Sequence, residues 1–205
     1  KIDVNNLEKY LGSKKYFYPD NENTSQIGVV NGLAYTPYGG DILPIEVTSF
    51  PGKGELILTG SLGDVMRESA RIALSYIKAN CKEYHIDVNY LDNIDIHLHV
   101  PEGAVPKEGP SAGVAITTAL LSLFTNTLVP SNISMTGEMT LRGKVLPIGG
   151  IKEKLIGAHR ANIKKVFLPK QNEKDLKEVP KDVKDELEII YVENYQEIFK
   201  KLKGR

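Results

Sequence analysis

The 205-residue sequence contains a single cysteine, Cys81, and no excess of charge of either sign. One thiol excludes an internal disulfide and any zinc site built from cysteines, which is consistent with a reducing compartment. Lysine plus arginine and aspartate plus glutamate number 26 each. The chain therefore has no global positive field to attract nucleic acid or anionic lipid.

Long hydrophobic runs are also lacking. No stretch approaches the ~20 apolar residues of a membrane-spanning helix, and the longest, residues 114–124, is interrupted by Thr117, Thr118 and Ser122. A secretory signal is not recognisable either. We expect no membrane partner, and because the sequence begins at Lys1 rather than methionine we expect it to be part of a longer protein.

Two nucleotide-binding motifs are missing as well. Gly103 and Gly109 are separated by five residues, and no Lys-Ser or Lys-Thr pair follows them, so the phosphate-cradling P-loop is not present. No G-x-G-x-x-G motif opens a helix after a strand. We expect neither ATP hydrolysis nor hydride transfer by this chain.

What is present is typical of a globular protein. Hydrophobic residues make up 41% and charged residues 25% of the chain, close to the average for folded domains. At ~100–200 residues per domain, the length suits one core and a small appendage. Residues 1–18 predict a short helix and a tail, and the polar, turn-rich segment 19–25 predicts a boundary.

Hydrophobic periodicity predicts helices and strands in alternation without a fixed repeat, and therefore a mixed α/β (α+β) fold. Strands are expected over residues 27–30, 32–35, 42–50, 55–59, 94–100, 133–140, 143–148, 166–168 and 187–192, and helices over residues 64–81, 110–124, 151–161, 173–177 and 195–202. The turn at residues 51–54 predicts a hairpin between strands 42–50 and 55–59. In the helix over 64–81, we expect Asp64 as the cap and Val65 on the buried stripe.

Two histidines, His97 and His99, share one face of the strand over residues 94–100 together with Asp95. Such a pair could begin a metal site. No H-E-x-x-H motif accompanies it, and strand histidines more often form hydrogen bonds at a polar edge. We therefore predict no metal.

Ser111 follows a loop rich in proline and glycine and lies in the first turn of an apolar helix. Free amides and the positive end of the helix dipole converge there, which stabilises the negative charge of an acyl-transfer intermediate. The alternative is that Ser111 only caps the helix, which is the commoner role of serine at such a position.

A serine nucleophile needs a base. Of the four histidines only His97 and His99 lie in a promising region. Lys154 is the other candidate, because it shares a helix face with Ile151 and Ala158. Burial would lower the pKa of this lysine and let it accept a proton near neutral pH. The alternative is a lysine that extends along the helix rim to water.

Several motifs together resemble the proteolytic domain of Lon, the ATP-dependent protease. They are Leu62-Gly63-Asp64-Val65-Met66, Pro101-Glu102-Gly103-Ala104, Pro110-Ser111-Ala112-Gly113, Met135-Thr136-Gly137-Glu138, Leu141-Arg142-Gly143, Leu146-Pro147-Ile148-Gly149-Gly150 and Lys152-Glu153-Lys154. The resemblance extends from about Gly28 to Phe199. It implies a fold similar to the second domain of ribosomal protein S5, with mixed sheets and packed helices.

The resemblance also implies the site residues. Ser111 would be the nucleophile, Lys154 the general base and then acid, and Thr136 a residue that orients the lysine. Gly109, Pro110 and Ala112 would support the serine. Glu108 departs from the aspartate that the family usually has before Gly-Pro-Ser, and we assign it no catalytic role.

The resemblance further implies two parts and their partners. Residues 1–20 would be the tail of a preceding ATPase module with its linker, and residues 21–205 the proteolytic domain. ATP and magnesium would act in the ATPase module, with no cofactor in this domain. A homo-hexamer that degrades unfolded, damaged and selected regulatory proteins is expected, in bacterial cytoplasm or alternatively the mitochondrial matrix.

Two rival functions come from other classes. A Lon-like module that binds or scaffolds without cleaving is the first, and the presence of both Ser111 and Lys154 argues against it. A nucleic-acid-binding domain is the second. It is supported only by the basic C-terminal residues Lys200, Lys201, Lys203 and Arg205, which are typical of a solvated end.

Overall fold

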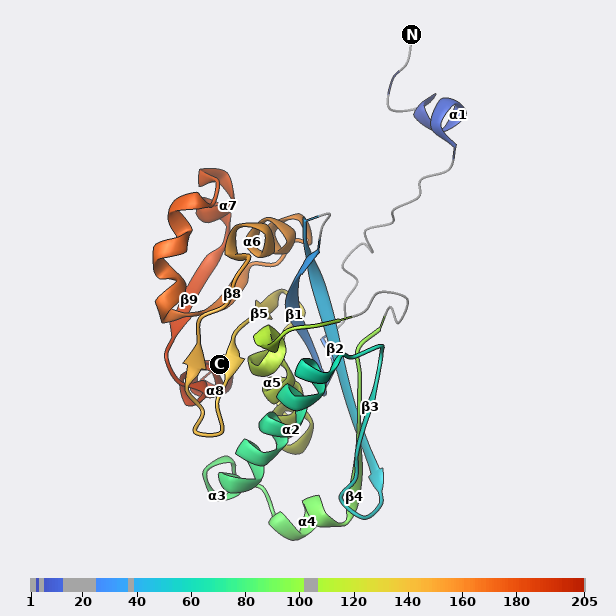
Figure 1. Ribbon diagram of the computed structural model, residues 1–205, viewed down its shortest axis with the longest axis vertical. Helices are drawn as coiled ribbons and strands as arrows, with labels where there is room; N and C mark the ends of the chain where they lie inside the picture. The colour runs from blue at the N-terminus through green and yellow to red at the C-terminus, as the bar shows by residue number, and fades with distance from the viewer. Residues whose placement is uncertain (1–2, 4–5, 13–24, 37–38, 102–106, 205) are drawn as a thin grey trace.

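The computed structural model describes residues 3, 6–12, 25–36, 39–101 and 107–204. A seven-stranded mixed sheet runs through the molecule with helices on both faces (Figure 1). This architecture confirms the expected mixed α/β class. The expected domain boundary after residue 20 and most of the N-terminal tail lie outside the described residues. Helix α1 (Leu7–Leu11) is the element of the expected N-terminal appendage that the structure describes.

Most elements fall close to their predicted positions. The strands are β1 (Val29–Thr36), β2 (Gly39–Pro51), β3 (Leu56–Thr59), β4 (Ile94–His99), β5 (Ile133–Met135), β6 (Glu138–Met139), β7 (Val145–Leu146), β8 (Lys165–Pro169) and β9 (Glu188–Val192). The other helices are α2 (Asp64–Ala79), α3 (Cys81–Tyr84), α4 (Val88–Asp92), α5 (Gly113–Phe124), α6 (Ile151–Arg160), α7 (Lys181–Glu186) and α8 (Tyr195–Lys203), with 3₁₀ segments η2 (Pro110–Ala112) and η3 (Lys170–Glu178). The short helices α4 and α7 were not predicted, because each buries one residue only, Leu91 and Val183 respectively.

The sheet has the strand order β3-β4-β2-β1-β5-β8-β9. Strands β2 and β4 are antiparallel, as are β1 and β2, whereas the pairs β3–β4, β1–β5, β5–β8 and β8–β9 are parallel. Strands β6 and β7 form a separate antiparallel ribbon. Four neighbouring strands, β1, β5, β8 and β9, therefore end at the same edge of the sheet.

The predicted hairpin between β2 and β3 is wrong. Strand β4 lies between them and pairs with both. The turn that follows β2 is held instead by the start of β4, because the Asp95 carboxylate accepts hydrogen bonds from the backbone N–H groups of Lys53 (2.8 Å) and Glu55 (2.9 Å). The strand that pairs with β2 is therefore β4, about forty residues further along the sequence, and not the neighbouring strand β3.

Helix α2 also differs from its prediction. Gly63, not Asp64, is the N-cap residue, and no side-chain capping bond is present there. Asp64 is the first helical residue, where its charge still complements the positive helix end. Val65 is 42% exposed, and the buried stripe begins at Met66.

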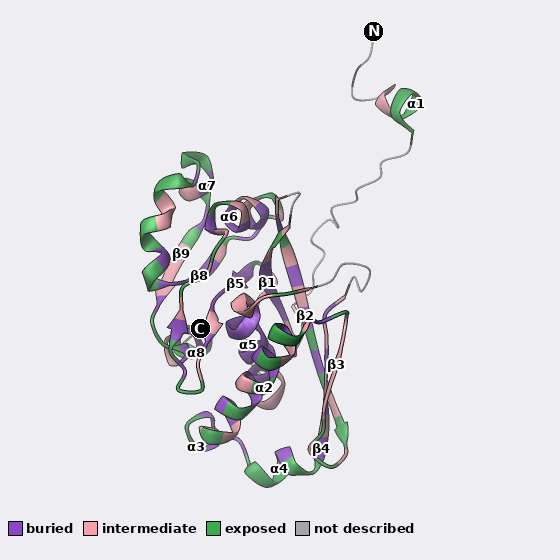
Figure 2. Cartoon of the chain, viewed as in Figure 1, coloured by how far each residue is buried: buried purple, intermediate pink, exposed green. Residues whose placement is uncertain are grey.

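Two hydrophobic cores lie on opposite faces of the sheet. Helices α2, α5 and α8 cover one face and α6 and α7 the other. Neighbouring residues of β8 alternate between them, Phe167 on the α5 side and Val166 and Leu168 on the α6 side, as the twofold period of a strand requires. Figure 2 shows α5 as the most buried helix, with α4 and α7 largely exposed. No helix in the described part of the chain is both long and apolar enough to cross a bilayer.

Buried hydroxyl groups in the two cores differ in how they are satisfied. On the α5 side, Thr118 Oγ1 donates a hydrogen bond to the Val114 carbonyl oxygen at 2.9 Å and is also hydrogen-bonded to Tyr195 Oη at 2.9 Å. On the α6 side, Ser134 is fully buried in β5 and its Oγ has no hydrogen-bond partner among the described residues. A buried polar group without a partner destabilises the folded state, whereas a paired one does not.

These two hydroxyls yield a prediction about stability. Ser134→Ala removes an unpaired group, and we expect the free energy of unfolding to stay unchanged or to rise by up to about 1 kcal/mol. Thr118→Val leaves Tyr195 Oη without this partner, and we expect a loss of about 1–2 kcal/mol. Urea denaturation of both variants beside the wild type measures the difference, and a larger loss for Ser134→Ala would contradict it.

Candidate active site

A break between β5 and β6 forms the centre of the site. The sequence predicted one strand over residues 133–140, but regular pairing stops at Thr136 and Gly137. The Gly137 N–H donates to the Ser111 carbonyl oxygen at 2.8 Å, and the Val114 N–H donates to the Gly137 carbonyl oxygen at 3.1 Å. The strand is interrupted because its backbone binds the segment that begins helix α5.

Ser111 lies in the 3₁₀ turn η2, directly before α5. Gly109 adopts a positive φ of 106°, which favours glycine, and Pro110 takes the first position of the turn. Ala112 is buried against the α5-side core. Neither η2 nor α5 begins with a side-chain capping bond, so the alternative of Ser111 as a simple helix cap is wrong.

Lys154 lies on the sheet-facing side of α6, between Ile151 and Ala158. Its side chain is only 3% exposed, so it does not extend along the helix rim to water. The amine Nζ donates a hydrogen bond to Thr136 Oγ1 at 3.2 Å. The Thr136 hydroxyl in turn donates to the Ser111 carbonyl oxygen at 3.1 Å.

The three residues meet because of topology. Helix α5 begins near the carboxyl end of β5, because the Val114 N–H donates to the Gly137 carbonyl oxygen. Lys154, in the first turn of α6, reaches Thr136 at the same end, while Lys164, after α6, donates to Asn132 at the other end of the strand. Thr136 is the first residue after β5. A serine from one helix layer and a lysine from the other are therefore brought to the same end of the sheet, where ligand sites of open α/β sheets usually lie.

The environment of Lys154 changes its proton affinity. Burial among apolar side chains lowers the pKa of the amine from 10.5 to about 8, because the charged form loses its hydration. No carboxylate in the described part of the chain forms a salt bridge with it. An appreciable fraction of the amine is therefore neutral at physiological pH and has a lone pair to accept a proton.

The hydrogen bonds that connect Lys154 to Ser111 end at the Ser111 carbonyl oxygen, a backbone atom. Ser111 Oγ and Lys154 Nζ are not hydrogen-bonded to one another in the described structure. Glu108 forms no ion pair with Lys154, and its carboxylate lies against Gly63 at the start of α2. Of the residues selected from the sequence, Ser111, Thr136 and Lys154 come together directly, with Gly109, Pro110 and Ala112 beside the serine.

One residue at this site was not identified from the sequence. Gly40, in β2, packs directly against the backbone of α6 at Glu153 and Lys154. The pair Gly39-Gly40 was the only local signal. Its partner lies more than a hundred residues away, so sequence periodicity could not reveal the contact.

The two strand histidines do not take part. Thr59 Oγ1 is hydrogen-bonded to His97 Nε2 at 2.9 Å and to His99 Nδ1 at 2.7 Å. This is the polar-edge arrangement that the sequence favoured. Among the described residues, no three His, Cys, Asp or Glu side chains are grouped as a metal site would require.

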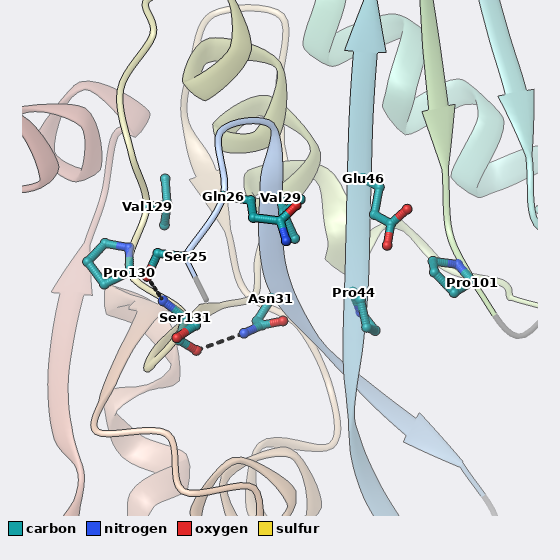
Figure 3. A pocket seen from close by; sticks show the side chains of 10 residues that line it. All are labelled: Ser25, Gln26, Val29, Asn31, Pro44, Glu46, Pro101, Val129, Pro130 and Ser131. Atoms are coloured by element: carbon teal, nitrogen blue, oxygen red, sulfur yellow. Dashed lines mark hydrogen bonds between the residues drawn. The ribbon is translucent and has the colours of Figure 1, made fainter. Parts of the chain in front are cut away.

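A surface cavity of about 270 Å³ lies away from these residues (Figure 3). Pro44, Pro101 and Pro130 form part of its wall, and Glu46 and Asn31 supply polar groups. The Asn31 amide already donates to the Ser131 carbonyl oxygen at 2.8 Å. Neither Ser111, Thr136 nor Lys154 lines the cavity, so it is separate from the serine–lysine site.

Comparison with known proteins decides the family. The model of the Lon protease (S16) C-terminal proteolytic domain matches residues 1–204. The chain belongs to the Lon protease family. It is 52% identical over 199 residues to the Lon protease of Wolbachia pipientis subsp. Culex pipiens, covering 97% of this chain and 24% of that protein. It is also 51% identical over 197 residues to Lon protease 1 of Bacillus subtilis, covering 96% and 26%.

The chain corresponds to the proteolytic part of a Lon protease. The Lon protease of Mycoplasma genitalium gives the same result, with 52% identity over 201 residues, 98% of this chain and 25% of the relative. The chain spans about a quarter of the length of these relatives. Its family is one of proteases.

The buried lysine predicts how stability depends on pH. Because its pKa is lower in the folded state, the unfolded state binds more protons between pH 8 and 10.5, and stability rises with pH across that window. Below pH 8 the full penalty applies, roughly 3 kcal/mol for a shift of this size. We expect Lys154→Met to be more stable than the wild type at pH 7, and the advantage to shrink as pH rises through 8 and beyond.

Chemical denaturation of the wild type and Lys154→Met from pH 6 to pH 9.5 tests this. The matched control is Lys152→Met on the same helix, whose side chain is exposed. The control should show no such trend. A pH-independent difference between Lys154→Met and the wild type would contradict the burial of a neutralised amine.

Proposed function

We propose that this chain is the serine endopeptidase domain of an ATP-dependent Lon protease, with Ser111 as nucleophile and Lys154 as general base. The observation that carries this proposal is the Lys154 amine, 3% exposed and hydrogen-bonded to Thr136, which is itself bonded to Ser111. A lysine acts as a base near neutral pH only where burial lowers its pKa. The rival role of a silent binding module explains no feature of this arrangement.

The first half of the reaction forms an acyl-enzyme. A rotation of the Ser111 side chain brings Oγ to the neutral Lys154 amine, which takes the hydroxyl proton as Oγ attacks the scissile carbonyl carbon. The resulting oxyanion lies at the start of η2 and α5, where backbone N–H groups and the positive helix end stabilise it. The Lys154 ammonium then gives its proton to the leaving amine, the C–N bond breaks, and an ester to Ser111 remains.

The second half regenerates the enzyme. The neutral lysine takes a proton from water, and the hydroxide equivalent attacks the ester carbonyl. When the second tetrahedral intermediate collapses, the ammonium returns its proton to Ser111 Oγ. One water is consumed for each peptide bond that is cleaved.

Supporting residues fix this geometry. Thr136 accepts a hydrogen bond from the amine and donates its own proton to the Ser111 carbonyl oxygen, so its lone pair is directed at Nζ. That arrangement leaves the lone pair of the neutral amine for the serine proton. Gly109, Pro110 and Ala112 fix the turn that carries Ser111.

The remaining parts of the protein are included in the proposal. The relatives named Lon protease are about four times as long as the matched region, which leaves room for an ATPase module that binds ATP and magnesium. We infer a homo-hexamer that degrades unfolded and damaged proteins and selected regulators, as part of protein quality control and the stress response. The bacterial sources of these relatives favour the bacterial cytoplasm over the mitochondrial matrix.

The dyad is tested in the full-length protein with ATP and an unstructured polypeptide such as casein. We expect Ser111→Ala and Lys154→Ala each to abolish cleavage, by at least ~10³-fold, while ATP hydrolysis and folding persist. The exposed Lys152→Ala on the same helix should cleave as the wild type does. A wild-type ring that hydrolyses ATP but leaves casein intact would instead favour the binding module.

Thr136 is tested by one substitution that keeps its shape and one that keeps its hydroxyl. Thr136→Val removes the hydroxyl, so the lysine amine loses its partner, and we expect kcat to fall by about 10–100-fold. Thr136→Ser keeps the hydroxyl and should retain most of the activity. A larger loss in Thr136→Ser than in Thr136→Val, measured on a fluorogenic peptide, would show that packing of the methyl group rather than the hydrogen bond matters.

A further inference from the structure

The contact between β2 and α6 is unusually close because glycines form it on both sides. A Cβ atom on Gly40 would overlap the carbonyl group of Glu153 and lie 2.8 Å from the backbone nitrogen of Lys154. Real Cβ atoms essentially never come this near to other atoms, and the atoms concerned are backbone rather than the end of a mobile side chain. A side chain at position 40 fits only if α6 moves away.

The opposite side of the contact is equally tight. A Cβ atom on Gly157 would lie 2.6 Å from the Gly40 carbonyl oxygen and 2.8 Å from the Asp41 nitrogen. One turn further along α6, the Arg160 guanidinium donates a hydrogen bond to the same Gly40 oxygen at 2.8 Å. Three successive turns of α6, at residues 153–154, 157 and 160, therefore rest on one peptide unit of β2.

Space, not backbone conformation, requires glycine at position 40. The φ angle of Gly40 does not lie in the left-handed region, in contrast to that of its neighbour Gly39 at 119°. An alanine would thus adopt the backbone conformation of Gly40 without strain. The effect of a substitution here reports on the distance between α6 and the sheet and on little else.

This contact lies at one end of the Lys154 residue, and the active-site hydrogen bond lies at the other. The backbone of Lys154 packs against Gly40 of β2, while its Nζ reaches Thr136 at the end of β5, on the far side of β1. Displacing α6 outward would either break the Nζ–Thr136 hydrogen bond or open the layer to water. Entry of water favours the charged amine, because burial is what lowers the pKa of Lys154.

We propose that Gly40 is a positioning residue for the catalytic lysine: the absence of a side chain there sets the depth of α6 and so keeps the Lys154 amine against Thr136 and out of water. The proposal deepens the proposed function and rests on it for its catalytic meaning. Gly40 itself contacts neither the substrate nor the reacting atoms. Its influence is transmitted entirely through the backbone of α6.

The test compares Gly40→Ala with Gly149→Ala, a matched control whose added methyl meets open space just before the same helix. NMR titration of the Lys154 Cε and Nζ signals in the 205-residue chain measures the pKa directly. We expect Gly40→Ala to move the pKa of Lys154 upward from about 8 toward 10.5. Such a shift lowers the neutral fraction at pH 7 by up to roughly 300-fold, and Gly149→Ala should leave it unchanged.

Kinetics provide the second readout. In the full-length protein the rising limb of kcat/KM against pH should move to higher pH in Gly40→Ala, with kcat at neutral pH reduced and the limb of Gly149→Ala unmoved. A folded Gly40→Ala variant with an unaltered Lys154 pKa and pH profile overturns the proposal. If Gly40→Ala does not fold, Gly157→Ala tests the opposite side of the same contact, and an unchanged Lys154 pKa there overturns it equally.

The two proposals fail in different ways. If the wild type does not cleave polypeptide but the Lys154 pKa responds to Gly40→Ala, the proteolytic role fails and the positioning role stands. If the wild type cleaves through Ser111 and Lys154 while the pKa of Lys154 is the same in Gly40→Ala as in the wild type, only the positioning role fails.

Discussion

Removal of the Lys154 amine from water is the constraint on which the rest of the structure depends. A charged ammonium in this apolar layer would be destabilised by roughly 3 kcal/mol relative to solvent, judged from its lowered pKa. The fold tolerates this because α6 is fixed on both sides, by Gly40 below its backbone and by Thr136 at the amine. An amine with a lowered pKa is thus obtained at the expense of stability.

The site also depends on where the sheet stops. Strand β5 ends at Met135. The Thr136 N–H still donates to the Phe167 carbonyl oxygen of β8, but both backbone groups of Gly137 bind Ser111 and Val114 instead of continuing the ladder. The break ties the start of α5 to the strand end, while α6 reaches the same point from the opposite face. Because β5 has a helix layer on each side, residues from both layers converge only at its end, which gives a serine and a lysine 43 positions apart a common partner in Thr136.

Much of this was accessible from the sequence. The alternation over residues 94–100 placed His97 and His99 on one half-exposed face, and the spacing of Ile151, Lys154 and Ala158 placed the lysine on a buried face. The same reasoning failed for the β2–β3 hairpin, because β4 competes for both edges and Asp95 satisfies the turn from a distance. It failed for Asp64 and Val65 because both lie in the first turn: Gly63 takes the cap position, and the buried stripe begins only at Met66.

The sequence by itself determined the class of fold, the order of most elements and the family resemblance, and it singled out the serine, lysine and threonine that the structure brings together. Periodicity, turn residues and motif spacing are local properties, and each can be read without knowing what packs against it. Only the tertiary structure decided that β4 enters between β2 and β3, that Ser111 is not a cap, that Lys154 is buried and that Gly40 supports its backbone. Those features depend on contacts between residues far apart in the chain, whose geometry is fixed only when both faces of the sheet are covered.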